Sequence, residues 1–84
     1  MTAAPSLTTR RVLVTGADGF LGRGVVAALA REGVSTLVAA DVREVPAERR
    51  LPGVIYLVQD VRDPALAQTL AAHAIDSVVH LASI

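Results

Sequence analysis

Short apolar runs alternate along this chain with longer segments that are apolar on one side only. Four runs rich in valine, leucine or alanine predict buried strands: residues 11–15, 35–41, 54–58 and 76–81. Two segments with apolar residues at helical spacing predict amphipathic helices: residues 20–31 and 64–74. The predicted order is therefore strand, helix, strand, loop, strand, helix, strand.

Several residues mark the ends of these elements. Gly33 follows the first helix, where a left-handed C-terminal cap is favoured. Asp63 is expected to cap the second helix, with Pro64 in its first turn. Residues 42–53 are polar and contain two prolines, which predicts a loop with one helical turn. Residues 1–9 predict a disordered tail.

The alternation of apolar strands with helices is typical of an α/β chain with a doubly wound parallel sheet. The composition agrees, because 52% of the residues are apolar and only 19% are charged. With 84 residues, the chain is at most one small domain.

Charge and residue usage exclude several classes of function. The net charge is zero, so neither nucleic acid nor an acidic membrane surface is an expected partner. The chain has no cysteine, and His73 and His80 lie on different predicted elements, so no metal site is expected. No apolar run is long enough to span a membrane, and no signal peptide is recognisable. We therefore expect a cytoplasmic protein.

Three glycines follow the first predicted strand and open the first predicted helix. Gly16 would allow a tight turn, Gly19 close approach of a diphosphate, and Gly22 close packing of helix on strand. The N–H groups of Phe20 and Leu21 would then point at the anion from the helix N-terminus. A tight turn that binds nothing is the alternative. A mononucleotide P-loop is excluded, because the chain has no lysine.

Acidic residues stand at the end of the second predicted strand and just after the third. Asp41 stands where a carboxylate binds the adenosine ribose of NAD, and it would repel the 2′-phosphate of NADP. Arg43 leaves NADP open as an alternative, because a guanidinium accepts that phosphate. Asp60 would accept a hydrogen bond from the adenine amino group, with Val61 beside the ring. A solvated strand end for Asp41, and turn chemistry for Asp60, are the alternatives.

Other polar residues are interpreted as structural. Asp18 is expected to point to solvent, and Arg10 and Arg11 to form a solvated start of the first strand. His80 is expected to be a packed strand residue with one satisfied nitrogen. Tyr56 is expected to lie in the core.

Four parts of the chain resemble, in the same order, the N-terminal half of the extended short-chain dehydrogenase/reductases: TGADGFLG (15–22), Asp41, DVRD (60–63) and VVHLAS (78–83). These are NAD-dependent epimerases and dehydratases that act on nucleotide sugars or related polyols and acids. The resemblance covers residues 11–84 and implies a Rossmann-type sheet whose first four strands have the order 3-2-1-4.

The resemblance also implies a set of cofactor-binding residues, carried over position by position. The pyrophosphate would be bound by Gly16, Gly19, Phe20, Leu21 and Gly22. The ribose would be bound by Asp41, and the adenine would be contacted by Asp60 and Val61. The nicotinamide half would lie near Leu81, Ala82 and Ser83.

The family's catalytic Tyr-x-x-x-Lys pair has no counterpart in this chain. The only tyrosine is Tyr56, and the residue four positions on is Asp60. We therefore predict no catalytic residue, and we read residues 10–84 as the NAD-binding part of a longer oxidoreductase. Its small-molecule substrate and a homodimer are expectations for the full-length protein. The alternative is a non-catalytic, redox-sensing dinucleotide module or an inactive fragment.

Overall fold

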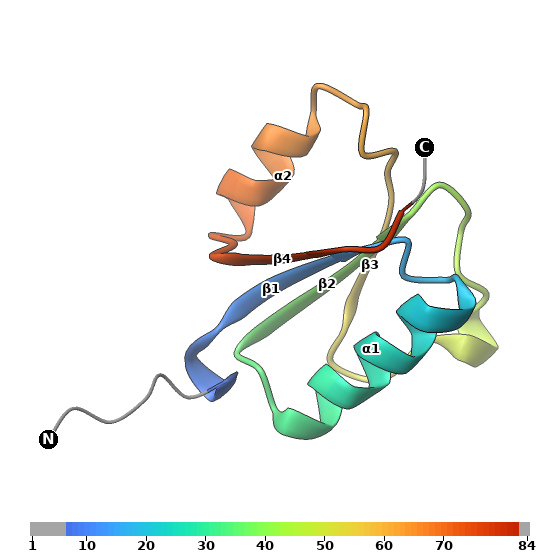
Figure 1. The fold of residues 1–84 in the computed structure, drawn as a ribbon, viewed down its shortest axis with the longest axis vertical. Helices are drawn as coiled ribbons and strands as arrows, with labels where there is room; N and C mark the ends of the chain where they lie inside the picture. Colours follow the sequence, from blue (N-terminus) through green and yellow to red (C-terminus); the bar gives the residue numbers. More distant parts are fainter. Residues whose placement is uncertain (1–6, 83–84) are drawn as a thin grey trace, which may run out of the picture.

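The computed structural model describes residues 7–82 of the chain. Among these residues, four parallel strands form one sheet in the order β3-β2-β1-β4. The strands are β1 (Arg11–Thr15), β2 (Thr36–Asp41), β3 (Ile55–Val58) and β4 (Ser77–His80). The helices α1 (Phe20–Glu32) and α2 (Leu66–Ala72) cover opposite faces of the sheet (Figure 1). The predicted α/β class, parallel sheet and strand order are confirmed.

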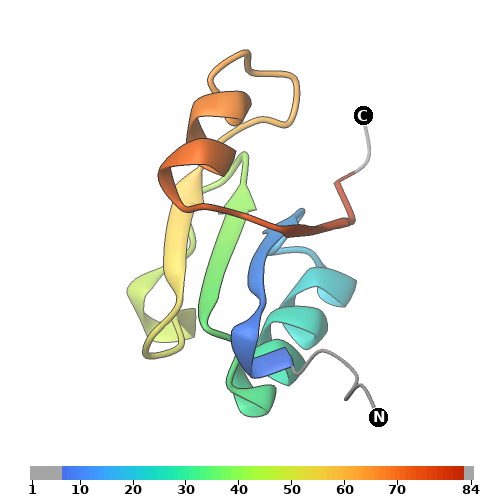
Figure 2. The ribbon, with the colours of Figure 1, turned by 90° about the vertical axis from the view of Figure 1, so that its left-hand side faces the viewer.

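Successive residues of the central strands bury their side chains on opposite faces of the sheet. On the α1 face, Val12 and Val14 pack with Val26 of the helix. On the α2 face, Leu13 packs in a second cluster that Leu66 and other α2 side chains cover. Figure 2 shows the two helices on either side of the strands. Burial on both faces explains why the strands are apolar at nearly every position.

Helix α1 ends as the sequence predicts. Gly33 has a φ of 72°, in the left-handed region, and its N–H donates to the Ala30 carbonyl at 3.1 Å. A residue without a Cβ adopts this conformation at little energetic cost.

Helix α2 is shorter at both ends than predicted. The Asp63 carboxylate accepts a hydrogen bond from the Ala65 N–H at 2.8 Å, so it closes a turn and the helix begins only at Leu66. At the other end, Ala74 has a φ of 49°, and the Ile75 N–H donates to the Leu70 carbonyl at 2.9 Å. This bond ends the helix early and turns the chain toward β4.

The remaining boundaries differ little from the prediction. Strands β2, β3 and β4 begin one residue later than predicted, and β4 ends one residue earlier. The predicted helical turn in the loop between β2 and β3 is confirmed as the 3-10 helix η2 (Ala47–Arg49). Leu7–Thr9, which we placed in a disordered tail, form a short 3-10 helix, η1. The rest of that tail lies outside the described residues.

The arginines at the start of β1 are more than solvated side chains. The Nε of Arg11 donates to the His73 carbonyl at 2.9 Å, and Arg10 pairs with Asp76 at 3.9 Å. Both contacts join the start of β1 to the segment that leads into β4. The expectation of a solvated strand start was therefore wrong for Arg11, whose side chain is partly buried.

Because the strands are parallel, their carboxyl ends meet at one edge of the sheet. At this edge Asp41 ends β2, while the glycine turn, Asp60 and Leu81 come after β1, β3 and β4. Between residues 7 and 82, no cluster of histidines and acidic residues could hold a metal ion. In the same part of the chain, no helix is both long and apolar enough to cross a membrane.

Candidate functional site

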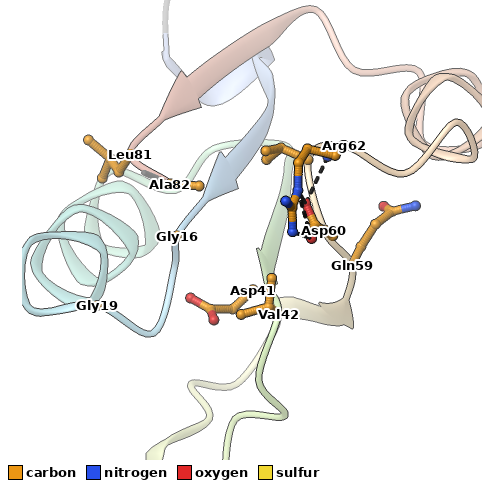
Figure 3. Close-up of a pocket in the computed structure, with 10 residues that line it drawn as sticks. Gly16, Gly19, Asp41, Val42, Gln59, Asp60, Arg62, Leu81 and Ala82 are labelled. Atoms are coloured by element: carbon orange, nitrogen blue, oxygen red, sulfur yellow. Dashed lines mark hydrogen bonds and ion pairs between the residues drawn. The ribbon is translucent and has the colours of Figure 1, made fainter. Parts of the chain in front are cut away.

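A cavity of about 420 Å³ opens at the carboxyl edge of the sheet. Segments that follow all four strands line it (Figure 3). It brings together most of the predicted site residues: Gly16, Gly19, Asp41, Asp60, Val61, Leu81 and Ala82. Val42, Gln59 and Arg62 also line it and were not predicted.

The other predicted residues lie at the start of α1 or beyond the described part of the chain. Gly22 is buried, whereas the side chains of Phe20 and Leu21 are 92% and 63% exposed. The role predicted for these two residues uses their backbone N–H groups. No side chain caps the N-terminus of α1, whose N-cap is Gly19, so the first amides of the helix are left for another acceptor. Ser83 lies outside the described residues.

The three glycines of the turn meet different constraints. Gly16 has a φ of 68°, and a Cβ there would lie 2.8 Å from the Ala82 nitrogen. A Cβ on Gly22 would overlap the Gly16 carbonyl oxygen. A Cβ on Gly19 would meet only that oxygen, at 3.3 Å. The fold itself therefore requires glycine at 16 and 22, whereas at 19 the missing side chain mainly keeps the cavity open.

Thr15, just before the turn, connects β1 to the end of β4. Its buried hydroxyl accepts hydrogen bonds from the N–H groups of Leu81 at 3.1 Å and Ala82 at 3.4 Å. It lies 2.8 Å from the His80 Nδ1. The Leu81 N–H also donates to the Thr15 carbonyl at 3.1 Å. Thr15 thus holds the backbone of Leu81 and Ala82 in place beside Gly16.

The sequence analysis missed Thr15. The available signal was a lone hydroxyl in an apolar strand, directly before a glycine. For His80, the expected single satisfied nitrogen is confirmed by the bond to Thr15. The expected packing was wrong, because His80 is exposed on the edge strand.

Two backbone amides hold the Asp41 carboxylate. Its Oδ2 accepts from the Asp18 N–H at 3.0 Å, and its Oδ1 accepts from the Arg43 N–H at 3.1 Å. Each oxygen keeps a further lone pair for a ligand. The turn after β1 and the turn after β2 therefore orient Asp41 jointly.

The expectation that Asp18 points to solvent was wrong. Its carboxylate accepts two hydrogen bonds from Nη2 of Arg49, at 2.8 and 3.0 Å. The Asp18 side chain is only 10% exposed. Because the two residues lie 31 positions apart, only the folded loop brings them together.

The Asp60 carboxylate is occupied by its near neighbour Arg62. Nη2 of Arg62 donates to Oδ2 at 2.6 Å, and both Nε and the backbone N–H of Arg62 donate to Oδ1. These hydrogen bonds lower the pKa of Asp60 to about 2. In Figure 3 the pair faces the cavity from the side opposite Leu81 and Ala82.

Tyr56 takes no part in the cavity. Its hydroxyl accepts from the Leu51 N–H at 2.8 Å, and its ring packs against the core on the α1 face. The guanidinium of Arg50 lies over the ring, 5.7 Å from its centre. The prediction of a structural tyrosine is confirmed.

The parallel 3-2-1-4 sheet, with a glycine turn and a cavity at its carboxyl edge, defines a Rossmann-type chain. The family model described as "NAD dependent epimerase/dehydratase family" matches residues 12–84. The chain belongs to this family. A search of curated proteins found no match.

Solved structures agree with this assignment. The Bordetella bronchiseptica enzyme WbmF in complex with NADH is 30% identical, with a TM-score of 0.74 over 98% of this chain and 25% of its own. A GalE-like L-threonine dehydrogenase from Cupriavidus necator is 28% identical, with a TM-score of 0.74 over 88% and 24%. UDP-glucose 4-epimerase from Thermotoga maritima is 27% identical, with a TM-score of 0.74 over 87% and 24%. The chain thus spans only 24% or 25% of the length of these three structures.

Proposed function

We propose that this chain binds NAD and forms the cofactor-binding part of an oxidoreductase of the epimerase/dehydratase type. The observation that carries the proposal is the uncapped N-terminus of α1, which follows the glycine turn at an open cavity. Membership of the family supports it. The solved complex of WbmF with NADH supports it as well.

The pyrophosphate is proposed to lie over the glycine turn. The N–H groups of Phe20 and Leu21 belong to the first turn of α1, where no side chain competes for them. The helix dipole adds a partial positive charge at the same place. Gly19 has no side chain to fill the adjoining part of the cavity.

The adenosine ribose is proposed to lie at Asp41. The lone pairs that Asp18 and Arg43 leave free would accept hydrogen bonds from the ribose hydroxyls. A 2′-phosphate about 4 Å from the carboxylate would be repelled by ~1–4 kcal/mol, depending on screening. On this basis NAD is the proposed cofactor. Arg43 uses its backbone N–H, not its guanidinium, to hold Asp41.

The adenine ring is proposed to lie between the segment after β2 and the loop after β3. Val42 and Val61 offer apolar contacts on the cavity wall. For Asp60 to accept from the adenine amino group, Arg62 must give up one of its hydrogen bonds. Oδ1 already accepts from the Arg62 N–H and Nε, and Oδ2 accepts from Nε and Nη2, so both lone pairs of each oxygen are used. The nicotinamide half is proposed to lie near Leu81, Ala82 and Ser83.

Bound NAD would supply a hydride acceptor for a substrate carbinol. This chain's own residues would hold and orient the cofactor, and its family's proton-transferring Tyr-x-x-x-Lys pair has no counterpart in the sequence. For the whole protein we propose a nucleotide sugar or a related polyol or hydroxy acid as substrate. The likeness to UDP-glucose 4-epimerase and to WbmF, which was also solved with UDP, supports a nucleotide-linked substrate.

Titration calorimetry on the intact protein tests the proposal. We expect NAD to bind more tightly than NADP, and Gly19→Val to weaken NAD binding by more than about tenfold, because the added side chain fills the diphosphate position. The melting temperature should change little, since a Cβ at 19 meets only one oxygen. Unchanged NAD affinity in the folded valine variant would refute the proposed diphosphate position.

A further inference from the structure

Arg49 joins two segments that the sequence keeps far apart. It belongs to η2, in the connection between β2 and β3, and its Nη2 binds the Asp18 carboxylate of the glycine turn at 2.8 Å. The Asp18 side chain is 10% exposed and that of Arg49 is 41% exposed. This ion pair is therefore partly shielded from water, which makes it stronger than a fully solvated pair.

The ion pair that fixes the Asp18 side chain also restrains Asp41. While its carboxylate is held by Arg49, its backbone N–H donates to the Asp41 Oδ2 at 3.0 Å. Both groups belong to one residue, so a side chain fixed in place also limits rotation of the peptide that carries the N–H. Asp41 is consequently oriented by a contact that begins in η2.

We infer that Arg49 and Asp18 are positioning residues for the ribose site: their ion pair keeps Asp41 turned toward the ribose hydroxyls. This inference rests on the proposed function, which places the ribose at Asp41. Within residues 7–82, Arg49 is the cation that forms an ion pair with the Asp18 carboxylate, so its removal leaves that carboxylate without this partner. The turn is then free to move, and Asp41 loses its fixed orientation.

The test combines a change in the protein with a change in the ligand. Binding of ADP and of 2′,3′-dideoxy-ADP is measured by titration calorimetry on the intact protein. Arg49→Ala should weaken ADP binding about threefold to fivefold, the upper part of the range for an ion pair near the surface. It should leave dideoxy-ADP binding unchanged, because that ligand lacks the hydroxyls that Asp41 would hold.

Two further variants of the same segment sharpen the result. Arg49→Lys keeps a cation that can reach Asp18, and it should restore most of the ADP affinity. Arg50→Ala is the matched control, because Arg50 pairs with the exposed Glu44 and does not contact Asp18. It should change the binding of neither ligand. Melting temperatures confirm that each variant is folded.

The outcomes separate the inference from the proposed function. If Arg49→Ala weakens both ligands equally, the ion pair has only a general structural role and the inference is wrong. If Asp41→Ala weakens ADP binding and Arg49→Ala does not, the inference fails while the ribose site stands. If the parent protein binds ADP and dideoxy-ADP equally well, the ribose site at Asp41 fails, and the inference fails with it.

Discussion

The glycine turn, residues 16–22, and the loop after β3, residues 59–63, both border the cavity, but they are held in place differently. Distant residues hold the glycine turn. The Ala17 N–H donates to the Ala40 carbonyl at 3.1 Å, and the Asp18 N–H donates to the Asp41 carboxylate. Gly16 lies against Ala82 so closely that a Cβ would meet its nitrogen at 2.8 Å.

Residues within a few positions of one another hold most of the loop after β3. Arg62 binds Asp60 through its side chain and its backbone N–H. The Asp63 N–H donates to the Asp60 carbonyl at 3.0 Å, and the Asp63 carboxylate binds the Ala65 N–H. Gln59, at the start of the loop, makes longer-range bonds: its N–H donates to the Asp41 carbonyl at 2.8 Å, and its Oε1 accepts from the Thr69 hydroxyl at 2.8 Å.

The difference determines how far residue identity can be interpreted as a sign of function. In the glycine turn, a Cβ is excluded at Gly16 by Ala82 and at Gly22 by the backbone of the turn itself, so the spacing of the glycines reports a particular geometry. In the loop after β3, aspartates are explained equally well by local turn bonds. The diphosphate position therefore has the stronger support, and the adenine position has the weaker support.

The largest effect is expected from Gly22→Ala, in the turn held by distant contacts. The new Cβ would overlap the Gly16 carbonyl oxygen and press on the Ala17 Cα. Such overpacking should destabilise the intact protein by ~3 kcal/mol and disrupt NAD binding. Urea unfolding and calorimetry measure the two effects.

Gly24→Ala is the matched control for that substitution. It lies in the same helix, and a Cβ there would meet nothing within 4 Å. Helix propensity should then stabilise the protein by about 0.5–1 kcal/mol, with NAD affinity unchanged. Equal effects of the two alanines would show that the close approach of Gly22 to Gly16 and Ala17 does not constrain the turn.

The same distinction explains what the sequence could predict. Strands, α1 and the glycine turn follow from hydrophobic period and glycine spacing, and all were predicted to within a residue or so. The late start of α2 was missed because Asp63 closes a local turn instead of capping the helix directly. The pairing of Asp18 with Arg49 was missed because it depends on the conformation of an entire loop. No spacing rule relates residues brought together in that way.

An intermediate effect is expected from Asp41→Ala, where both turns converge. Removing a carboxylate that binds ribose hydroxyls should weaken NAD binding about tenfold, the size of a lost hydrogen bond to a charged group. NADP binding should weaken less or improve, because the repulsion of its phosphate is also removed. Calorimetry with both cofactors measures the ratio.

Glu44→Ala is the control for charge alone. Glu44 is an exposed carboxylate in the connection after β2, and it pairs with Arg50 outside the cavity. It should leave the ratio of NAD to NADP affinity unchanged. A change in that ratio as large as the one caused by Asp41→Ala would mean that overall charge, and not the position of Asp41, sets the preference.

The smallest effect is expected from Asp60→Asn, in the locally held loop. Hydrogen bonds from Arg62 lower the pKa of Asp60 from 3.8 to about 2. A lowered pKa in the folded state means that the charged form stabilises the fold above pH 3.8, and that this stabilisation is lost as the pH falls toward 2. The melting temperature of the variant should therefore lie slightly below that of the parent at pH 7, and the gap should close between pH 4 and pH 2.

The same melting temperatures can also be compared at low and high ionic strength. Because the Asp60–Arg62 pair is solvent-exposed, high ionic strength should narrow the gap at pH 7 too. Arg62→Gln should reproduce both trends, since it removes the other half of the same pair. If the gap instead persists at pH 2 and in high salt, Asp60 stabilises the loop through something other than this local pair. The loop after β3 would then depend on wider contacts, as the glycine turn does, and its aspartate would become stronger evidence for an adenine site.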